Sequence, residues 1–253
     1  KIFRRAIRKP KMESANKNIL LFGSGMMVLP LLEYLTKREE NYITMATNIL
    51  PDGQKLAAKV RNTTAVEADV TNVDMLRDLI KGRDLVISYV PPPLHPPIAR
   101  TCVELGVHML TASYVSDTMR ELDPEAKKKG VILFNEIGLD PGIDILATFK
   151  VVDEVEEKGG KILSYESYCG GLPSPDSYDN PFGYKFSWAP QGAMRAMGNP
   201  AIFLKDGERV EIEKGTVMRQ FEPMNSMHPT LKMEGFPNRN SIQYKEEYRL
   251  HDT

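Results

Sequence analysis

The stretch Lys17-Asn-Ile-Leu-Leu-Phe-Gly-Ser-Gly-Met-Met-Val-Leu-Pro30 decides the fold of this 253-residue chain. A short apolar run that passes through two glycines into a helix-period segment predicts a buried parallel strand, a tight turn and a helix. Gly23 allows the turn, and Gly25 lets the backbone approach a pyrophosphate held by free N–H groups at the helix start. Val28 stands at the third glycine of the usual Gly-x-Gly-x-x-Gly, so the match is partial.

From residue 18 to about 136 the chain repeats this alternation of strand and helix. Strand-like runs occupy 18–22, 42–46, 64–70, 84–90, 107–111 and 131–135, and helical patterns occupy 26–37, 54–60, 73–80, 98–105 and 116–129. Asp52 and Asn72 are suited to cap helices, and Ser116 opens a polar first turn. Strands that alternate with helices indicate right-handed crossovers and a parallel sheet covered on both faces. The sequence therefore predicts an α/β fold built on a doubly wound, Rossmann-type sheet.

Beyond Asp144 the pattern becomes that of an α+β domain. A helix is expected over 145–157, a half-buried antiparallel strand over 161–168 and a second helix over 191–198, followed by short strands. We divide the chain into a basic linker or tail (1–17), an NAD(P)-binding Rossmann domain (18–138) and a truncated substrate domain (139–253). The sheet edge of the substrate domain is expected to face the cofactor.

Composition narrows the class of protein. A net charge of −1 gives no reason to expect a nucleic acid or an anionic membrane as partner. Two cysteines make no disulfide framework and indicate a reducing compartment, and no apolar run approaches the roughly 20 residues of a membrane span. The chain starts with Lys and is expected to be a fragment, a processed form or one module. Its basic segment 1–17 is interpreted as a linker or fusion remnant, or as the remnant of an organelle-targeting segment.

Ligands of such sheets bind at the carboxyl ends of the strands, so the residues that leave each strand are cofactor candidates. Thr47 and Asn48 follow the second strand. An acidic residue there favours NAD and an arginine favours NADP, and Asn48 is neither, so the choice between the two stays open. The next strand ends give Asp69-Val70 near the adenine, a proline-rich loop (91–97) read as a non-helical wall of the nicotinamide pocket, and the hydroxyl-rich run Thr111-Ala112-Ser113-Tyr114.

The chain resembles a known family through a set of motifs in consistent order. They are Gly23-Ser24-Gly25 with Pro30, Val86-Ile87-Ser88 with Pro91 and His95-Pro96, Thr111-Ala112-Ser113-Tyr114, the run from Asn135 to Asp144, Ser167-Tyr-Cys-Gly-Gly-Leu-Pro173, Asn180-Pro181, Tyr184-Lys-Phe-Ser-Trp188 and Pro237-Asn-Arg-Asn-Ser241. These motifs, spread from 18 to about 248, are similar to those of the glutamate-forming saccharopine dehydrogenases. Members occur as separate fungal enzymes and as the second half of animal and plant aminoadipic semialdehyde synthases.

The resemblance implies a reaction in lysine metabolism: saccharopine, NAD(P)⁺ and water interconvert with glutamate and 2-aminoadipate 6-semialdehyde. A substrate with three carboxylates needs cationic and hydroxyl clamps, and the hydrolysis needs proton relays. By resemblance the cofactor contacts are Ser24, Gly25, Met26, Met27, Asp69, Val90, Leu139, Asp140 and Pro141, and the substrate contacts are Ser113, Tyr114, Asp140, Asn238, Arg239 and Asn240. Asp140, Cys169 and Tyr114 are the acid–base candidates. The strand-end positions add Gly23, Thr47, Asn48, Val70, Thr111 and Ala112 to the cofactor set, and Trp188 is added as a wall of the pocket.

The resemblance also sets expectations for assembly and location. It implies either a homodimer or a covalent fusion to an upstream lysine-ketoglutarate reductase domain. The protein is expected to be cytoplasmic as a separate enzyme and mitochondrial as part of an animal synthase. Three departures stand out: Asn48 lies near a position that is arginine in fungal members, Asn240 replaces an aspartate and Ile145 replaces a histidine. Family members also continue for about as much chain again.

Several residues carry a plain structural interpretation beside the functional one. Asp140 before Pro141 suits a turn, Cys169 a small buried residue, and His95 a structural role in the proline loop. Arg239 suits either a surface ion pair or a bidentate carboxylate clamp, and Trp188 either a core anchor or a pocket wall. Cys102 is expected in the core, Lys185 half-buried, and His108, His228 and His251 lack the spacing of a metal site.

Two other functions are weighed against saccharopine oxidation. The first is a non-catalytic dinucleotide-binding module, favoured by Asn240, Ile145 and the missing second half. The second is a dehydrogenase of another amine, a polyamine or a carboxyamine, which the Arg239 clamp and the hydroxyls disfavour.

Overall fold

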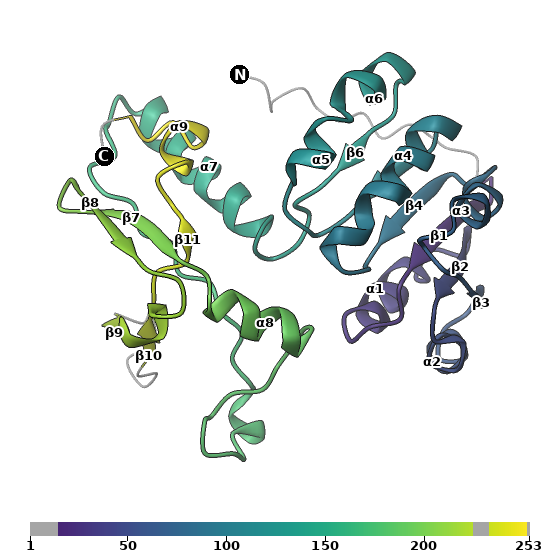
Figure 1. Cartoon of the computed structure of the whole chain (residues 1–253), viewed down its shortest axis with the longest axis horizontal. Coiled ribbons are helices and arrows are strands. Elements are labelled where there is room, and N and C mark those ends of the chain that lie inside the picture. Colours follow the sequence, from purple (N-terminus) through teal and green to yellow (C-terminus); the bar gives the residue numbers. More distant parts are fainter. Residues whose placement is uncertain (1–14, 225–232, 252–253) are drawn as a thin grey trace. The chain divides into compact units, whose positions relative to one another are not determined.

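A six-stranded sheet organises the first part of the molecule (Figure 1). In the computed structural model, which describes residues 15–224 and 233–251, its strands run in the order β3-β2-β1-β4-β5-β6, and every neighbouring pair is parallel. The strands are β1 (Lys17–Phe22), β2 (Asn41–Thr47), β3 (Thr63–Glu67), β4 (Leu85–Ser88), β5 (His108–Leu110) and β6 (Leu133–Phe134). The chain direction across the sheet reverses between β1 and β4, which is the switch point at which Rossmann folds bind ligands. The predicted doubly wound sheet is confirmed.

Helices cover both faces of this sheet. They are α1 (Val28–Leu35), α2 (Leu50–Ala57), α3 (Val73–Ile80), α4 (His95–Leu105), α5 (Asp117–Arg120) and α6 (Asp123–Lys129). Alternate residues of β1 enter different cores: Ile19 and Leu21 pack with α1 and α2, whereas Leu20 and Phe22 pack with α3 and α4. Since both faces of β1 are buried, the strand reads as a continuous apolar run. The prediction that Cys102 belongs to the core is also confirmed, because it is fully buried in α4.

The expectation that the proline-rich loop is not helical is wrong. Pro92–Leu94 forms a 3₁₀ turn, and α4 starts directly at His95, with Pro96 and Pro97 in its first turn. The first N–H groups of a helix have no partner inside the helix, so proline is tolerated there and its fixed φ suits the start. Two prolines at this place therefore begin the helix three residues before the predicted Ile98.

Helix starts follow local chemistry, with some shifts from the sequence expectation. Asn72 caps α3 and accepts a hydrogen bond from the Met75 N–H at 3.1 Å, as predicted. The helix expected over 116–129 is two short helices, α5 and α6, and the second has a proline in its first turn. Asp52 does not cap α2 but lies inside its first turn. The helix already begins at Leu50, and Pro51 occupies its second position.

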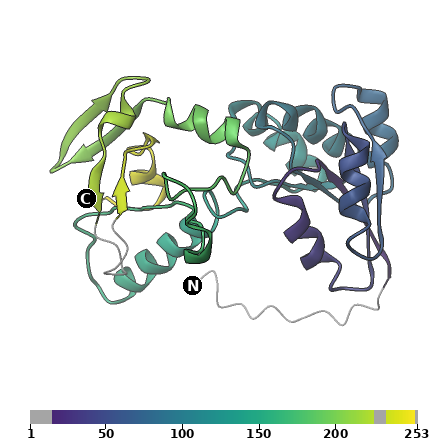
Figure 2. The ribbon, with the colours of Figure 1, turned by 90° about the horizontal axis from the view of Figure 1, so that it is seen from below.

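The chain divides into two compact units, one ending at Ile137 and one starting at Gly138. The described residues of the second include α7 (Ile143–Glu157), α8 (Pro190–Met197) and α9 (Tyr244–Glu247), and the strands β7 (Ala201–Lys205), β8 (Glu208–Ile212), β9 (Glu222–Met224), β10 (Met233–Gly235) and β11 (Arg239–Asn240). β7 pairs antiparallel with β8 and parallel with β11, and β9 pairs with β10. Figure 2 shows the green hairpin of β7 and β8 from below. The α+β character of this part is as predicted.

One predicted strand of the second unit is wrong. Residues 161–168 form no strand, and Leu163 in this segment is 80% exposed. Alternation predicts a strand only where a neighbouring strand supplies ladder hydrogen bonds, and none pairs with this segment among the described residues. In the same described ranges, no helix is long and apolar enough to span a bilayer.

Candidate functional site

The glycine turn after β1 is built as the sequence requires. Gly23 has φ of +110°, and its N–H donates to the Ala46 carbonyl at 2.9 Å. A Cβ on Gly23 would lie 3.0 Å from the Tyr89 carbonyl oxygen, so both the backbone angle and the space require glycine. A Cβ on Gly25 would meet no described atom within 4 Å. Glycine at 25 is therefore not demanded by packing within the unit.

The position of the usual third glycine has a packing role instead. Val28 is 1% exposed and belongs to the core between β1, β2 and helices α1 and α2. A side chain there fills the contact between helix and sheet, which a glycine would leave to close backbone approach. The partial match to the dinucleotide pattern thus leaves the turn and the start of α1 intact.

Hydroxyl groups link the ends of β1 and β2. The Ser24 and Thr47 hydroxyl oxygens are 2.8 Å apart, and Thr47 also accepts from the Ile49 N–H at 3.1 Å. Asn48 lies between these contacts and is exposed. The end of β2 therefore offers hydroxyls and an amide, without a charge at Asn48 that would select for or against a ribose phosphate.

A carboxylate marks the end of β3. Asp69 accepts hydrogen bonds from the Thr71 N–H at 2.9 Å and from the Thr71 hydroxyl at 2.7 Å. These two hydrogen bonds, the backbone one first, lower the pKa of the Asp69 carboxyl. The side chain is exposed and negatively charged at neutral pH.

A buried histidine connects the ends of β4 and β5. His95, 2% exposed, has its Nδ1 at 2.9 Å from Ser88 Oγ and its Nε2 at 2.8 Å from Ser113 Oγ. Thr111 Oγ1 lies 3.3 Å from the same Nε2. Burial lowers the pKa of His95 to about 4, so the imidazole is neutral at physiological pH. We name Ser88, His95, Thr111 and Ser113 the imidazole cluster.

The second unit places an acidic loop beside a thiol. The loop closes on itself through hydrogen bonds from Gly138 N–H to the Pro141 carbonyl and from Gly142 N–H to the Asp144 carboxylate. Cys169 is exposed, so it is not the small buried residue that the structural interpretation suggested. Desolvation of its thiol, the negative charges of Asp140 and Asp144, and a hydrogen bond to Asp140 raise the pKa of Cys169. The thiol is therefore protonated at neutral pH and suited to donate a proton, not to act as a thiolate nucleophile.

The remaining candidates of the second unit lie on two segments. Arg239 and Asn240 form β11, and the Asn240 side-chain oxygen accepts from the Ile242 N–H at 3.1 Å. Asn238 and Trp188 are exposed, and the Trp188 ring lies against Gly192 in α8, where a Cβ would come within 2.6 Å of it. Lys185 is half-exposed and pairs with Asp179 at 2.8 Å.

The structure sorts the predicted site residues into two groups. The first group lies at or just beyond the carboxyl ends of the strands of the six-stranded sheet. It comprises Gly23, Ser24, Gly25, Met26, Met27, Thr47, Asn48, Asp69, Val70, Val90, Thr111, Ala112, Ser113 and Tyr114. The second unit carries Leu139, Asp140, Pro141, Cys169, Trp188, Asn238, Arg239 and Asn240. The sequence did not predict the contact between Ser24 and Thr47 or the imidazole cluster, because both depend on how separate strands align.

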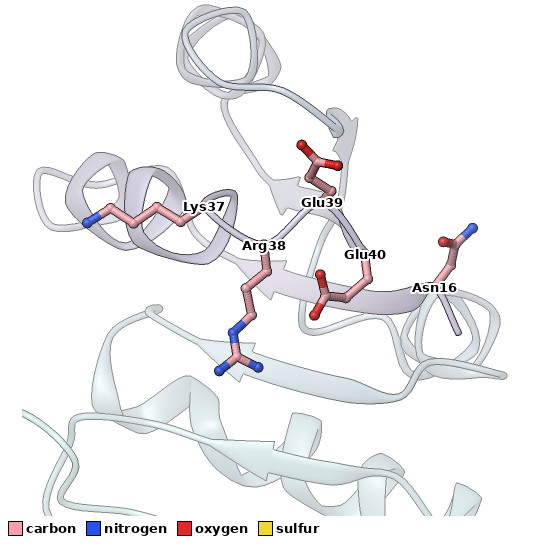
Figure 3. Close-up of a pocket in the computed structure, with 5 residues that line it drawn as sticks. All are labelled: Asn16, Lys37, Arg38, Glu39 and Glu40. Carbon is pink, nitrogen blue, oxygen red and sulfur yellow. The ribbon is translucent and has the colours of Figure 1, made fainter. Parts of the chain in front are cut away.

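A surface depression lies at the opposite end of the sheet. Figure 3 shows Asn16 just before β1 and Lys37, Arg38, Glu39 and Glu40 from the loop between α1 and β2. These side chains carry mixed charges and include none of the candidate residues. Among the described residues, no group of three or more His, Cys, Asp or Glu side chains is arranged to hold a metal ion. His228 lies outside those residues, and His108 accepts a hydrogen bond from the Ile132 N–H at 3.0 Å.

Comparison with known proteins assigns most of the chain to one family. Residues 19–134 match the model of the saccharopine dehydrogenase NADP binding domain, and residues 138–253 match that of the saccharopine dehydrogenase C-terminal domain. The chain belongs to the saccharopine dehydrogenase family. The resemblance inferred from the motifs is therefore confirmed.

This member of the saccharopine dehydrogenase family is similar to individual relatives both in sequence and in structure. The chain is 41% identical to saccharopine dehydrogenase [NADP(+), L-glutamate-forming] of Schizosaccharomyces pombe, over 92% of this chain and 52% of that enzyme. It is 38% identical to the mitochondrial alpha-aminoadipic semialdehyde synthase of Rattus norvegicus, over 94% of this chain and 26% of the synthase. The apo saccharopine dehydrogenase (L-Glu forming) of Saccharomyces cerevisiae superposes with a TM-score of 0.85 at 38% identity, over 94% of this chain and 53% of that one. The chain thus spans about half the length of the fungal relatives it matches.

Proposed function

We propose that the protein is an oxidoreductase of lysine metabolism that interconverts saccharopine, NAD(P)⁺ and water with L-glutamate and 2-aminoadipate 6-semialdehyde. The observation that carries the proposal is the agreement between site and relatives. The glycine turn, the hydroxyl-rich strand ends and the acidic loop with its thiol occur in a chain about 40% identical to enzymes of that name. Hydroxyls and arginine suit a substrate with three carboxylates better than they suit a polyamine.

The first unit would hold the dinucleotide, which supplies the hydride acceptor when bound. Gly25 leaves open space at the start of α1, where free N–H groups favour phosphate oxygens. Met26, Met27, Val90, Thr111 and Ala112 lie around the same edge of the sheet, with Asp69 and Val70 at the end of β3 on the adenine side. Ser113 and Tyr114 supply hydroxyls for the substrate from the end of β5.

The second unit would supply the proton transfers and the cationic clamp. Desolvation and the charges of Asp140 and Asp144 raise the pKa of Cys169, which favours the protonated thiol. A protonated thiol beside a carboxylate forms a donor–acceptor pair, which is what the addition of water to an imine and the departure of an amine require. Arg239, with Asn238 and Asn240, would bind a substrate carboxylate through its planar guanidinium.

Cofactor choice rests on the end of β2. Asn48 neither repels a 2′-phosphate, as a carboxylate would, nor pairs with it as an arginine would. We expect the protein to accept both NAD and NADP, with a smaller preference between them than an enzyme that has a carboxylate or an arginine at this position. The curated fungal relatives carry NADP(+) in their names, which favours NADP as the better of the two.

The test is saccharopine-dependent reduction of the nicotinamide at alkaline pH, with NAD⁺ and NADP⁺ in parallel. Turnover with either dinucleotide supports the assignment and ranks the cofactors. A folded protein that binds dinucleotide without turnover would instead indicate a non-catalytic dinucleotide-binding module. Turnover only with another amine would reassign the substrate.

The substrate clamp has its own prediction. Arg239→Ala should raise the KM for saccharopine by about 10- to 100-fold, since a charge-assisted hydrogen bond is worth about 1.5–3 kcal/mol. Dinucleotide affinity, measured by fluorescence titration, should stay unchanged. Saccharopine kinetics equal to those of the wild type would count against Arg239 as the clamp.

Assembly and location follow the relatives that match. We propose a homodimer where the protein is a separate enzyme, as in fungi, and fusion to a lysine-ketoglutarate reductase domain where it forms part of a synthase. The location would be cytoplasmic in the first case and mitochondrial in the second. Mass measurement of the native protein by light scattering distinguishes the two assemblies.

A further inference from the structure

The imidazole cluster joins the ends of β4 and β5 and the start of α4 to one partly exposed hydroxyl. Ser88 ends β4 and is fully buried, Thr111 follows β5 and is 1% exposed, and His95 joins both from the first turn of α4. Ser113 is the member of the cluster that is only partly buried. It is also the member for which the proposed function assigns a substrate contact.

Burying an imidazole costs free energy unless its ring nitrogens form hydrogen bonds. An apolar side chain of similar size would fill the same space without the cost of removing a polar ring from water. Both ring nitrogens of His95 have hydroxyl partners within 2.9 Å, so the ring is fixed in orientation as well as in position. A fully satisfied buried network of this kind is rigid, and it transmits that rigidity to the group at its exposed end.

Ser113 is held from three sides. Its hydroxyl contacts His95 Nε2 at 2.8 Å, its N–H donates to Thr111 Oγ1 at 3.3 Å, and its carbonyl accepts from the Glu136 N–H at 3.1 Å. An isolated serine hydroxyl rotates freely among three rotamers. With one direction occupied by the imidazole, the remaining hydrogen-bonding capacity of Ser113 points in defined directions.

We propose that His95 is a positioning residue that fixes the Ser113 hydroxyl for a carboxylate of the substrate. This inference rests on the proposed function, because it takes Ser113 as a saccharopine contact. His95 acts through Ser113 and touches neither substrate nor cofactor. A site group held in its productive geometry before the substrate arrives loses less entropy on binding, which improves affinity for the substrate.

The test is a double-mutant cycle with His95→Phe and Ser113→Ala, read out as saccharopine KM and kcat. Each single variant should raise KM by about 10- to 100-fold, the range for a hydrogen bond to a charged group. kcat should change less, because a contact made equally in ground and transition states affects KM. If His95 works through Ser113, the double variant should be no worse than Ser113→Ala alone.

Two controls separate positioning from general loss of structure. Thr101→Val removes a buried hydroxyl of α4 that donates to the Pro97 carbonyl at 3.0 Å and lies outside the cluster. It should lower stability and leave KM unchanged. His95→Gln keeps a hydrogen-bonding side chain and should recover part of the affinity that His95→Phe loses.

A second measurement needs no turnover and no variant of His95. The ¹⁵N resonance of the His95 Nε2 should shift in Ser113→Ala and stay in place in Thr101→Val. Additive effects in the cycle, or an unshifted resonance, overturn the inference while saccharopine turnover by the wild type still supports the proposed function. A wild-type protein without turnover overturns both.

Discussion

At the scale of single residues, two glycines of one turn have different reasons to be glycine. The folded protein itself requires glycine at position 23, because φ is +110° and the Tyr89 carbonyl oxygen lies where a side chain would be. Gly25 has open space around it, so its lack of a side chain benefits a bound molecule and not the unbound protein. A pair of identical substitutions therefore separates folding from binding.

Gly23→Ala should destabilise the protein by about 1–3 kcal/mol, the range for an L-residue held in a rarely occupied backbone region. Gly25→Ala should change stability by less than about 0.5 kcal/mol and weaken NADP⁺ binding, because its methyl group occupies the approach to the phosphates. Urea unfolding measures the first quantity and fluorescence titration the second. Equal stabilities for the two variants would contradict the steric argument.

His95 makes stability depend on pH. The unfolded chain takes up a proton at about pH 6.5, whereas the buried imidazole does so only at about pH 4. Between these values the unfolded state binds more protons, so stability falls as the pH falls, and it levels off below about pH 4. The full loss amounts to about 3 kcal/mol.

The comparison that isolates this contribution is wild type against His95→Gln, which cannot titrate. Urea unfolding at several pH values between 4 and 7.5 should show the two stabilities converging as the solution becomes more acidic. Parallel curves would mean that the imidazole is not buried in neutral form.

At the scale of elements, the sequence predicted the sheet because its signals are local. Most strands of the first unit are short apolar runs bounded by their own turns, and α3 was predicted with its bounds and its cap from the nine consecutive residues 72–80. The prediction for the proline-rich loop was wrong because proline breaks a helix in its interior but is tolerated in its first turn. Composition alone does not distinguish these two positions.

The site was predictable only in part, for a related reason. Strand-end positions identified Thr111 and Ser113, since parallel strands end at one edge. The contact of His95 with both depends on the register that sets Val86 beside Met109, between residues far apart in the sequence. The absent strand at 161–168 shows the reverse case, in which a local pattern lacks the neighbouring strand that would complete it.

The N-cap of α3 gives a direct test of the local signal. Asn72→Ala removes the bond to the Met75 N–H and should cost about 1 kcal/mol, which lowers the melting temperature by a few degrees. Asn72→Asp keeps an acceptor at the same place and should be close to wild type. If both variants melt alike, the capping bond does not contribute.

At the scale of the whole molecule, the two units have separate cores. Leu20 and Phe22 belong to the cores of the first unit, whereas Val152 packs with Tyr248 and Leu250 in the second. The C-terminal segment is held to α7 by Arg249, which pairs with Asp153 and Glu156, and by the Tyr248 ring, which packs edge-on against Phe149 of α7. Cores that share no residues can unfold in separate steps.

We therefore expect a calorimetric scan to show two transitions that respond to different changes. Leu20→Ala, which empties a fully buried site of the first unit, should lower one transition, and Val152→Ala should lower the other, each by about 1–4 kcal/mol of unfolding free energy. NADP⁺ at about 100 times its dissociation constant should raise the transition that Leu20→Ala lowers by about 2.7 kcal/mol, because binding stabilises only the unit that holds the ligand. A single transition shifted equally by both variants and by the dinucleotide would show instead that the two units unfold as one, with the dinucleotide stabilising the whole chain.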